Sequence, residues 1–355
     1  MRELALKATI VKTLDEIRAL ESQWAKLTPP SPFSSWDYAY HWLRCAPEAQ
    51  AHVIAVHSRG ELVGVAPWCL SRDYAGSRVL TGIGKESAWY HDPLIVPGYD
   101  ASRVFQAIGE ALCHRKWDAI DLTLQTEHSL PLITELKRLG MTVTQRASEQ
   151  QSHVLAFEDD WEACWKRFPS SFRKGVRRLN RHLESIPHRY LQAPQAHALE
   201  WIEDVIALNR TRWNTGENWE LTYAVMRANT PTLLAQGDLR LYGLEIEGRM
   251  AALAYHIRKG NRSFALIGNY HPDFAEYSPS NLLLHWLLTQ LHQEGVRWVD
   301  LGPGEYDYKN RIQSGLVETV RTQVGTSLLG MALVGWRGMI KARASAPQKQ
   351  YNFIN

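Results

Sequence analysis

The sequence predicts an α/β protein with mixed sheets, built from one sheet-and-helix module that occurs twice. Residues 239–301 read as a strand hairpin, a third strand, a long helix and a further strand. Residues 51–124 contain a hairpin, a helix and a strand in the same order. Alternating apolar runs between glycine turns are typical of strands, and apolar residues three or four apart are typical of helices. A repeat of this length indicates a duplicated module rather than a solenoid.

The second module is the clearer copy. Its hairpin is RLYGLEIEGRMAALAYHI, with the turn at Glu247-Gly248, and the third strand is SFALIGNYHP. The helix YSPSNLLLHWLLTQLHQEG follows, and VRWVDLG closes the module. In the first module, AHVIAVHSRGELVGVAPWCL, SRVFQAIGEALCHRKW and WDAIDLTL correspond to the hairpin, the helix and the last strand. The alignment pairs Gly60 with Gly248, Ala66 with Ala254 and Asp121 with Asp300.

The repeat suggests a division of the chain. We expect a first domain over residues 1–150, a connecting strand with basic helices over 151–238, a second domain over 239–330 and a tail over 331–355. A length of 355 residues is consistent with about two domains.

Composition excludes several classes of protein. The chain is 45% hydrophobic and 22% charged with a net charge of +3, which is ordinary for a globular protein and gives no reason to expect DNA binding. The four cysteines are scattered, so we expect neither a disulfide framework nor a metal site, and a cytoplasmic location. No run is long enough to span a bilayer. The motifs of serine hydrolases, zinc proteases and nucleotide-binding loops are absent.

The most charged stretch is FPSSFRKGVRRLNRHLES, which has helical periodicity with one apolar face. Arg173, Arg177 and Arg181 recur every four residues, a spacing at which like charges repel weakly. The stripe is either a solvated surface or a binding site for a phosphate-rich ligand, CoA or RNA, because arginine binds phosphate with two donors.

A polar loop follows the strand WVDL. Gly302-Pro303-Gly304 turns the chain after Asp300, and two tyrosines, two acids and two bases then fall within seven residues, namely Glu305, Tyr306, Asp307, Tyr308, Lys309 and Arg311. Functional groups gather where strands of α/β folds end. We therefore expect this loop to line a site, although an ion pair between Asp300 and Lys309 would also be a purely structural arrangement.

Aromatic residues lie in two other loops. Trp89, Tyr90 and His91 precede Pro93, and Trp213 lies at the end of the helix expected over 196–213. These side chains are either a wall for the acceptor substrate or packed loop residues. A sugar face would suit such rings.

Taken in order, these segments resemble the CelD/BcsL-type acetyltransferases, a branch of the GNAT superfamily related to the Fem peptidyltransferases. The most specific pieces are Tyr277-Ser278-Pro279, Asp300-Leu301-Gly302 with Gly304, and Tyr308-Lys309. The resemblance implies two tandem GNAT-like domains, the first degenerate, and acyl transfer from acyl-CoA to an amine. It makes Lys309 important. The usual pyrophosphate loop is missing, but Ser280 or Asn281 at a helix N-terminus could present N–H groups to phosphate.

A mechanism follows as a hypothesis. Asp300 would take the proton of the acceptor amine, directly or through water, and the strand around Ile267–Tyr270 would stabilise the oxyanion. Tyr308 or Tyr306 would protonate the thiolate, Lys309 would stabilise charge, and Arg173 and Arg177 would bind phosphate. Tyr270, Ser278, Ser280 and Asn281 complete the expected donor site, and Glu305 joins the aromatic residues on the acceptor side. The acceptor would be a small molecule or a sugar of an exopolysaccharide precursor.

Two rival functions stay open. An aminoacyl-tRNA-dependent transferase would bind RNA along residues 166–189 with a steep salt dependence. A non-catalytic scaffold would bind neither CoA nor tRNA.

Overall fold

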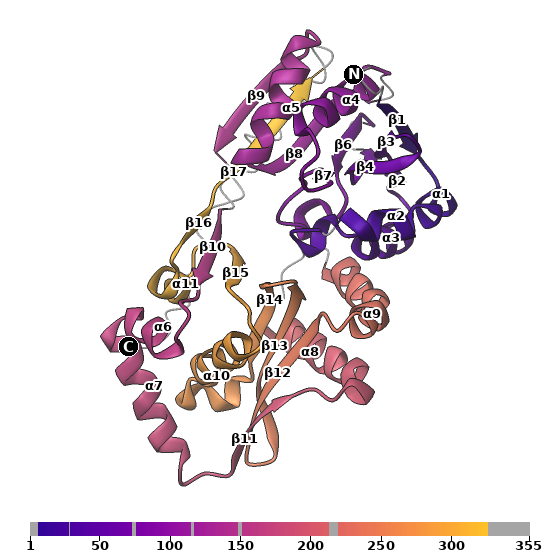
Figure 1. Cartoon of the computed structure of the whole chain (residues 1–355). Helices are drawn as coiled ribbons and strands as arrows, with labels where there is room; N and C mark the ends of the chain where they lie inside the picture. Colours follow the sequence, from indigo (N-terminus) through magenta and orange to yellow (C-terminus); the bar gives the residue numbers. More distant parts are fainter. Residues whose placement is uncertain are drawn as a thin grey trace. The chain divides into compact units, whose positions relative to one another are not determined.

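The computed structural model describes residues 6–27, 29–72, 76–114, 117–147, 151–212 and 219–325. The chain forms two compact units, which Figure 1 shows with their elements. Unit 1 comprises residues 1–150 and 318–355, and unit 2 comprises residues 151–317. Both contain mixed sheets flanked by helices, so the predicted α/β class is confirmed.

Unit 1 has two sheets. The first has the order β1 (Lys7–Val11), β3 (Val53–Ser58), β4 (Glu61–Ala66), β7 (Leu94–Ile95). The second has the order β2 (Gln50–Ala51), β5 (Trp68–Arg72), β6 (Arg78–Gly82), β8 (Ala119–Gln125), β17 (Thr319–Gly325), β9 (Thr142–Ala147). Its α-helices are α1 (Leu14–Ala19), α2 (Glu21–Trp24), α3 (Trp36–Cys45), α4 (Ala101–Cys113) and α5 (Thr126–Arg138).

Unit 2 is built on one seven-stranded sheet. Its order is β11 (His188–Gln192), β12 (Leu239–Ile246), β13 (Arg249–Lys259), β14 (Arg262–Tyr270), β15 (Trp298–Pro303), β10 (Ser152–Ala156), β16 (Gly315–Val317). The helices are α6 (Trp161–Arg167), α7 (Ser170–Leu183), α8 (Ala198–Arg212), α9 (Trp219–Ala235), α10 (Pro279–Gln293) and α11 (Asp307–Ile312). A short 3-10 turn, η5 (Pro272–Tyr277), precedes α10.

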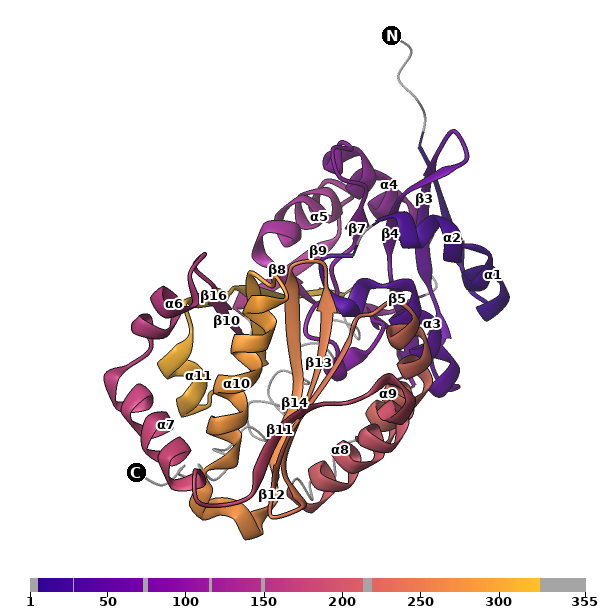
Figure 2. The same ribbon diagram turned by 60° about the horizontal axis from the view of Figure 1, so that its bottom comes forward.

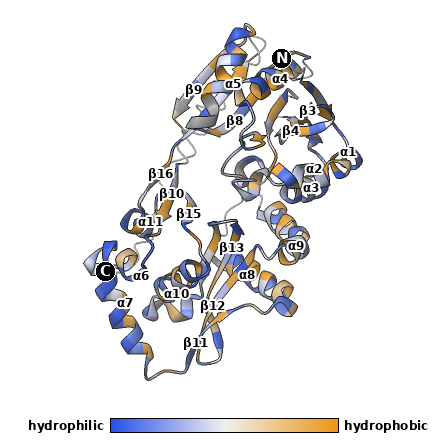
Figure 3. Ribbon diagram, viewed as in Figure 1, coloured by the Kyte–Doolittle hydropathy of each residue, from blue (hydrophilic) through white to orange (hydrophobic). Residues whose placement is uncertain are grey.

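The helices of unit 2 cover both faces of this sheet. Figure 2 shows α10 on one side of β12–β14 and α8 and α9 on the other. Leu244 and Leu282 belong to the apolar core beneath α10 and α7, whereas Tyr255 and Ile206 belong to the core beneath α8 and α9. Figure 3 shows that α7 is mostly hydrophilic. Only its apolar stripe, which includes Phe172 and Val176, is buried.

The duplication is confirmed by matching backbone detail. Both hairpins turn on two left-handed residues, Arg59-Gly60 with φ of 53° and 86°, and Glu247-Gly248 with φ of 51° and 75°, which is the conformation of a type I′ turn. The register shifts close to the turn in each hairpin. In the sheets, the parallel ladders end at the pairs Thr81–Asp121 and Phe264–Asp300, as the alignment of the two aspartates requires.

In each unit, one strand comes directly after the last strand of the other unit in sequence. β10 follows the last strand of unit 1 in sequence, but it lies between β15 and β16 of unit 2. β17 follows β16, but it lies between β8 and β9 of unit 1. The sequence grouped residues 319–325 with the second module and treated 151–238 as a connection. In the structure β17 completes the first unit, while β10, β11, α8 and α9 are integral to the second.

Within the described residues, no helix has both the length and the apolarity needed to cross a membrane.

Candidate functional site

The central feature of unit 2 is the point where β14 and β15 separate. Their parallel ladder contains the pairs Arg262–Trp298, Ser263–Val299 and Phe264–Asp300 and then ends, although β14 continues to Tyr270. On its other edge β14 stays paired with β13 up to Tyr270, with a register shift at Leu266, which falls between the partners of Tyr255 and His256. The second half of β14 therefore borders a divergence of the sheet, the position where ligands bind in open α/β sheets.

Gly268 makes this border accessible. It is exposed although β14 is an interior strand, and an added Cβ would meet no atom within 4 Å. Glycine inside a strand often marks a place where another chain or a ligand approaches the backbone closely. Tyr270 lies two residues further on the same strand face and is half-buried against the α10 core.

Helix α10 begins beside this strand with an unusual cap. Ser278, the N-cap, is left-handed (φ 45°), its side chain caps no N–H, and Pro279 occupies the first turn. No acidic residue lies in that turn, and Ser280 and Asn281 are half-exposed there. A helix N-terminus carries partial positive charge, and here no carboxylate of its own offsets it. The predicted donor residues Ser278, Ser280 and Asn281 are thus together in space.

The loop after β15 is held by Asp300 and Lys309. One carboxylate oxygen of Asp300 accepts from Gly302 N at 2.9 Å. Lys309 Nζ donates to Gly302 O at 3.0 Å and to Pro303 O at 2.7 Å. Gly302 has φ of 77°, a left-handed conformation that favours glycine. The ion pair with Asp300 that the sequence left open as a structural alternative is not formed, because the hydrogen bonds of Lys309 go to main-chain oxygens.

Burial tunes this lysine. Lys309 is 4% exposed, and desolvation lowers its pKa to about 8, while the negative charges of Asp300 and Glu305 act in the opposite direction. Its ammonium also lies 5.0 Å from the ring centre of Tyr306. Nearby, Tyr308 packs against the α10 core, and burial raises its pKa, so this phenol keeps its proton. The first turn of α11, which follows the loop, therefore combines a buried cation with a protonated phenol.

Glu305 is an exposed carboxylate of this loop, and Asp307, at the start of α11, is also exposed but pairs with Arg311. Asn310 Nδ2 donates to Glu305 Oε2 at 3.2 Å, and Asn310 Oδ1 lies 2.9 Å from His153 Nε2. His153 belongs to the incoming strand β10 and is 1% exposed. The structure therefore joins Glu305 to a strand that the sequence assigned to a connection.

The arginines of α7 have different roles. Arg173 Nε donates to Phe168 O at 3.0 Å, which ties α7 to the end of α6. Arg177 is exposed, as are Lys174, Arg178 and Arg181. No carboxylate of the described residues makes an ion pair with these four side chains. Near the end of α7, the His182 ring lies 5.5 Å from Tyr277, next to Ser278.

The corresponding place in unit 1 is filled by protein. His91 Nδ1 accepts from Thr123 N on β8 at 3.0 Å, and His91 Nε2 lies 2.9 Å from Lys85 O. A Cβ on Gly82, the last residue of β6, would lie 2.1 Å from the His91 ring. Trp89 and Tyr90 pack on Phe33, with ring centres 5.1 and 6.3 Å apart. His91 thus fills the divergence between β6 and β8, while Trp89 and Tyr90, expected with it on the acceptor side, pack on Phe33. Trp213 lies outside the described residues.

Helix α4 of unit 1, which corresponds to α10 of unit 2, has an N-terminus that is already capped by a carboxylate. Its N-cap is Asp100, whose carboxylate accepts from Ser102 N at 3.0 Å. A carboxylate at a helix N-terminus occupies the place that a phosphate would take. Unit 1 therefore lacks both the exposed strand and the open helix end that unit 2 has.

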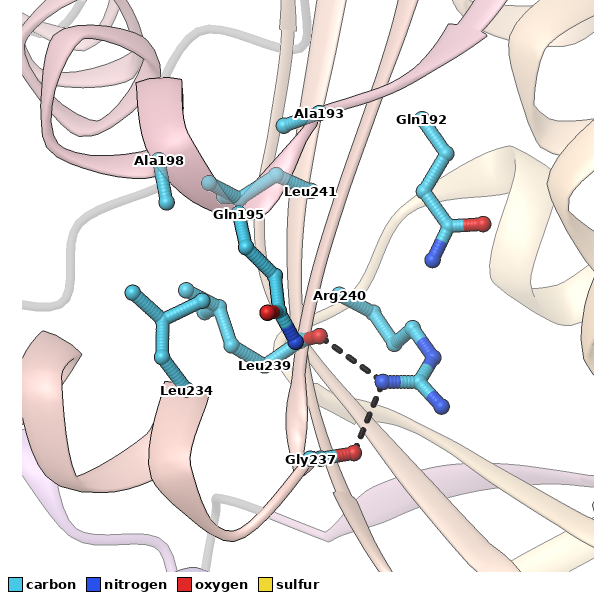
Figure 4. A pocket seen from close by; sticks show the side chains of 9 residues that line it. All are labelled: Gln192, Ala193, Gln195, Ala198, Leu234, Gly237, Leu239, Arg240 and Leu241. Atoms are coloured by element: carbon cyan, nitrogen blue, oxygen red, sulfur yellow. Dashed lines mark hydrogen bonds between the residues drawn. The ribbon is translucent and has the colours of Figure 1, made fainter.

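One cavity lies elsewhere in unit 2, at the ends of β11 and β12. It has a volume of about 80 Å³ and is lined by Gln192, Gln195 and Arg240 among others (Figure 4). Arg240 Nη1 already donates to Gly237 O and Leu239 O. Ligand sites usually enclose at least ~300 Å³, so we assign this cavity no substrate. Among the described residues no group of His, Cys, Asp and Glu is arranged to hold a metal ion.

The comparisons with known proteins agree with this geometry. A family model described as an acetyltransferase (GNAT) domain matches residues 170–310, which contain β14, α10 and the loop after β15. The fold is that of a GNAT-type acyltransferase. Among curated proteins, none matches the chain.

Solved structures resemble nearly the whole GNAT-like chain. FemX shares 13% identity with a TM-score of 0.60, covering 89% of this chain and 96% of FemX. The C-terminal domain of a putative lysylphosphatidylglycerol synthetase from Agrobacterium fabrum shares 12% identity with a TM-score of 0.57, covering 91% and 95%. L-PGS from Bacillus licheniformis shares 9% identity with a TM-score of 0.51, covering 88% and 97%. At such identities the likeness shows the fold alone.

Sequence reasoning missed several residues of this site. Gly268 carried a usable signal, since a glycine inside a strand pattern indicates close backbone approach. His153 and Asn310 carried none, because they are 157 residues apart. The same is true of Asn269, whose Nδ2 donates to Asn209 Oδ1 on α8 and so ties the end of β14 to that helix.

Proposed function

We propose that unit 2 catalyses transfer of an acyl group, first of all acetyl, from acyl-CoA to an amine. The observation that carries the proposal is the exposed main chain at Gly268, beside the point where β14 and β15 diverge. An extended acyl donor could lie against this strand without displacing any side chain.

The donor side is supported by the start of α10. Partial positive charge without an acidic cap favours a pyrophosphate at Ser278, Ser280 and Asn281. Arg177 on α7 offers a cation without a carboxylate partner among the described residues, whereas Arg173 is engaged by Phe168 O. Tyr270 would border the same path at the end of β14.

The reaction needs two proton transfers. The amine nitrogen attacks the thioester carbonyl carbon, the C–S bond breaks, and the amine proton goes to a carboxylate. We assign that role to Glu305, because it is exposed, whereas the predicted base Asp300 binds Gly302 N within the turn. Tyr308, which is protonated before the reaction, or Tyr306 donates its proton to the leaving thiolate and regains one from solvent. Lys309 holds the loop in shape and supplies positive charge, and N–H groups near Ile267 would stabilise the oxyanion.

The acceptor class rests on the resemblance described above. An amino sugar of an exopolysaccharide or envelope precursor is our first choice, and a cytoplasmic location follows from a need for acyl-CoA. Trp89 and Tyr90, the aromatic residues first expected for such an acceptor, pack on Phe33 within unit 1.

One observation favours a second candidate, transfer from an aminoacyl-tRNA. The exposed cations of α7 follow one another along the helix, and a polynucleotide, whose phosphates repeat along its length, suits such a row. This alternative predicts tRNA binding that weakens steeply with salt and that is lost when Arg177, Arg178 and Arg181 are replaced by glutamine.

The deciding experiment incubates the protein with acetyl-CoA and a panel of amino sugars while free thiol is measured. Amine-dependent thiol release, together with saturable heat on titration with CoA, supports the proposal. Aminoacyl transfer from tRNA without CoA binding supports the second candidate. If neither donor binds, the protein is a scaffold and both proposals are wrong.

A further inference from the structure

We infer that His153, on the strand that unit 2 receives from the preceding segment, is a positioning residue for Glu305 and acts through Asn310. The inference deepens the proposed function, because it rests on Glu305 as the proton acceptor. It depends on a chain of three side chains from β10, α11 and the loop after β15.

The proton position on His153 follows from its surroundings. His153 Nδ1 is buried and has no hydrogen-bond partner. A hydrogen on that nitrogen would be a buried donor without an acceptor, which is unfavourable. The hydrogen therefore belongs on Nε2, which then donates to Asn310 Oδ1 at 2.9 Å.

This fixes the orientation of Asn310. With its oxygen occupied by His153, the amide must direct Nδ2 outward, and Nδ2 donates to Glu305 Oε2 at 3.2 Å. Asn310 itself is exposed, so packing alone does not hold its amide. An ionised carboxylate can only accept hydrogen bonds, and the direction of the chain matches that need.

The backbone places His153 where this chain is required. β10 pairs with β15 at Val154–Asp300 and Ser152–Pro303, with a register shift between these pairs. His153 therefore lies opposite the irregular part of β15 that carries Leu301 and Gly302. In unit 1 the inserted strand β17 instead places Arg321 on Asp121, the aspartate that corresponds to Asp300. The inserted strand thus supplies a partner for the aspartate itself in unit 1, and a partner for Asn310 of α11 in unit 2.

The test compares His153→Leu with His153→Gln in the full-length protein. Glutamine can place an amide donor near the position of Nε2, whereas leucine keeps the volume and removes the donor. We expect His153→Leu to lower kcat about tenfold and to move the acid limb of the pH–rate profile up by about one unit, the effect of one lost hydrogen bond to a charged group. We expect His153→Gln to retain both. The charged groups near Glu305, namely Asp300, Asp307, Lys309 and Arg311, are unchanged in both variants.

Asn310→Leu removes the same link at an exposed position and should reproduce His153→Leu without loss of folding. The inference is overturned if the acid limb is unshifted in both leucine variants. It is also overturned if His153→Gln lowers kcat and shifts the acid limb as much as His153→Leu does. The ¹⁵N chemical shifts of His153 provide a readout independent of turnover: a hydrogen on Nδ1 would also overturn it. If Glu305→Gln leaves the acid limb in place while His153 carries its hydrogen on Nε2, the assignment of Glu305 fails rather than the chain that positions it.

Discussion

Lys309 Nζ donates to the main-chain oxygen of Gly302 at 3.0 Å, so a buried ammonium closes the left-handed turn at the end of β15. The second bond, to Pro303 O, anchors the residue next to it. The lysine is thus bound to the backbone of the loop that presents Glu305 and Tyr306, which gives it a role in shape as well as in charge.

Replacing Lys309 by methionine should disrupt this turn. Methionine keeps the length of the side chain but leaves two carbonyl oxygens without their donor. A hydrogen bond to a charged group contributes about 1.5–3 kcal/mol, so we expect turnover to fall about 10- to 100-fold. Lys259→Met, at a lysine of unit 2 that pairs with Asp238, is the control and should keep its turnover. Equal turnover in wild type and Lys309→Met would contradict the assignment.

The same lysine should make the free energy of unfolding depend on pH in the alkaline range. The unfolded chain keeps this proton up to a pKa of 10.5, whereas burial lowers the pKa to about 8 in the folded state. Between these values the unfolded state binds more protons, so stability rises with pH. Urea unfolding should show wild type gaining up to about 3 kcal/mol over Lys309→Met across this window. A constant difference between the two proteins would show that Lys309 is not buried as a cation.

Gly268→Leu should block the donor without unfolding the protein. Nothing lies within 4 Å of an added Cβ, so the side chain would enter the space beside β14 rather than the core. We expect CoA binding, measured by calorimetry, to weaken at least tenfold, with the unfolding midpoint within a few degrees of wild type. Gly315→Leu on β16, also without neighbours within 4 Å, is the matched control and should bind CoA normally. Unchanged CoA binding in Gly268→Leu would place the donor elsewhere.

His91→Ala should weaken unit 1 without impairing turnover. The change removes the contacts to Thr123 N and Lys85 O and leaves a cavity, at a cost of about 3 kcal/mol. The measurements are urea unfolding and turnover per folded molecule. Loss of turnover at unchanged stability would instead support the sequence-based expectation that Trp89, Tyr90 and His91 contact the acceptor.

Arg321→Met tests the strand that unit 1 receives. Arg321 binds the largely buried carboxylate of Asp121 with two nitrogens. Removing one partner of a buried pair typically costs about 3–5 kcal/mol, so the variant should unfold at much lower urea. The double variant Asp121→Asn with Arg321→Met should recover part of this loss, because no charge stays unpaired. Additive losses would show that the two side chains are not coupled.

Much of the fold could be predicted because its signals are local. The turns at Gly60 and Gly248, the helix at 279–293 and the strand that carries Asp300 follow from periodicity and from glycine at left-handed positions, although that strand continues to Pro303 rather than ending at Asp300. The loop at 300–309 could be predicted as a candidate site because polar residues cluster after an apolar strand. The role of Lys309 was only half predicted, since the pattern shows its charge but not that carbonyl oxygens are its partners.

By itself, the sequence determined that one module occurs twice and that its second copy ends in a polar loop, because strand alternation and turn chemistry act between near neighbours. Only the tertiary structure decided which strand joins which sheet, why His91 fills one copy while Gly268 leaves the other accessible, and how His153 reaches Asn310. These outcomes depend on contacts between residues far apart in sequence, which hydrogen bonding and packing select only once the chain is folded.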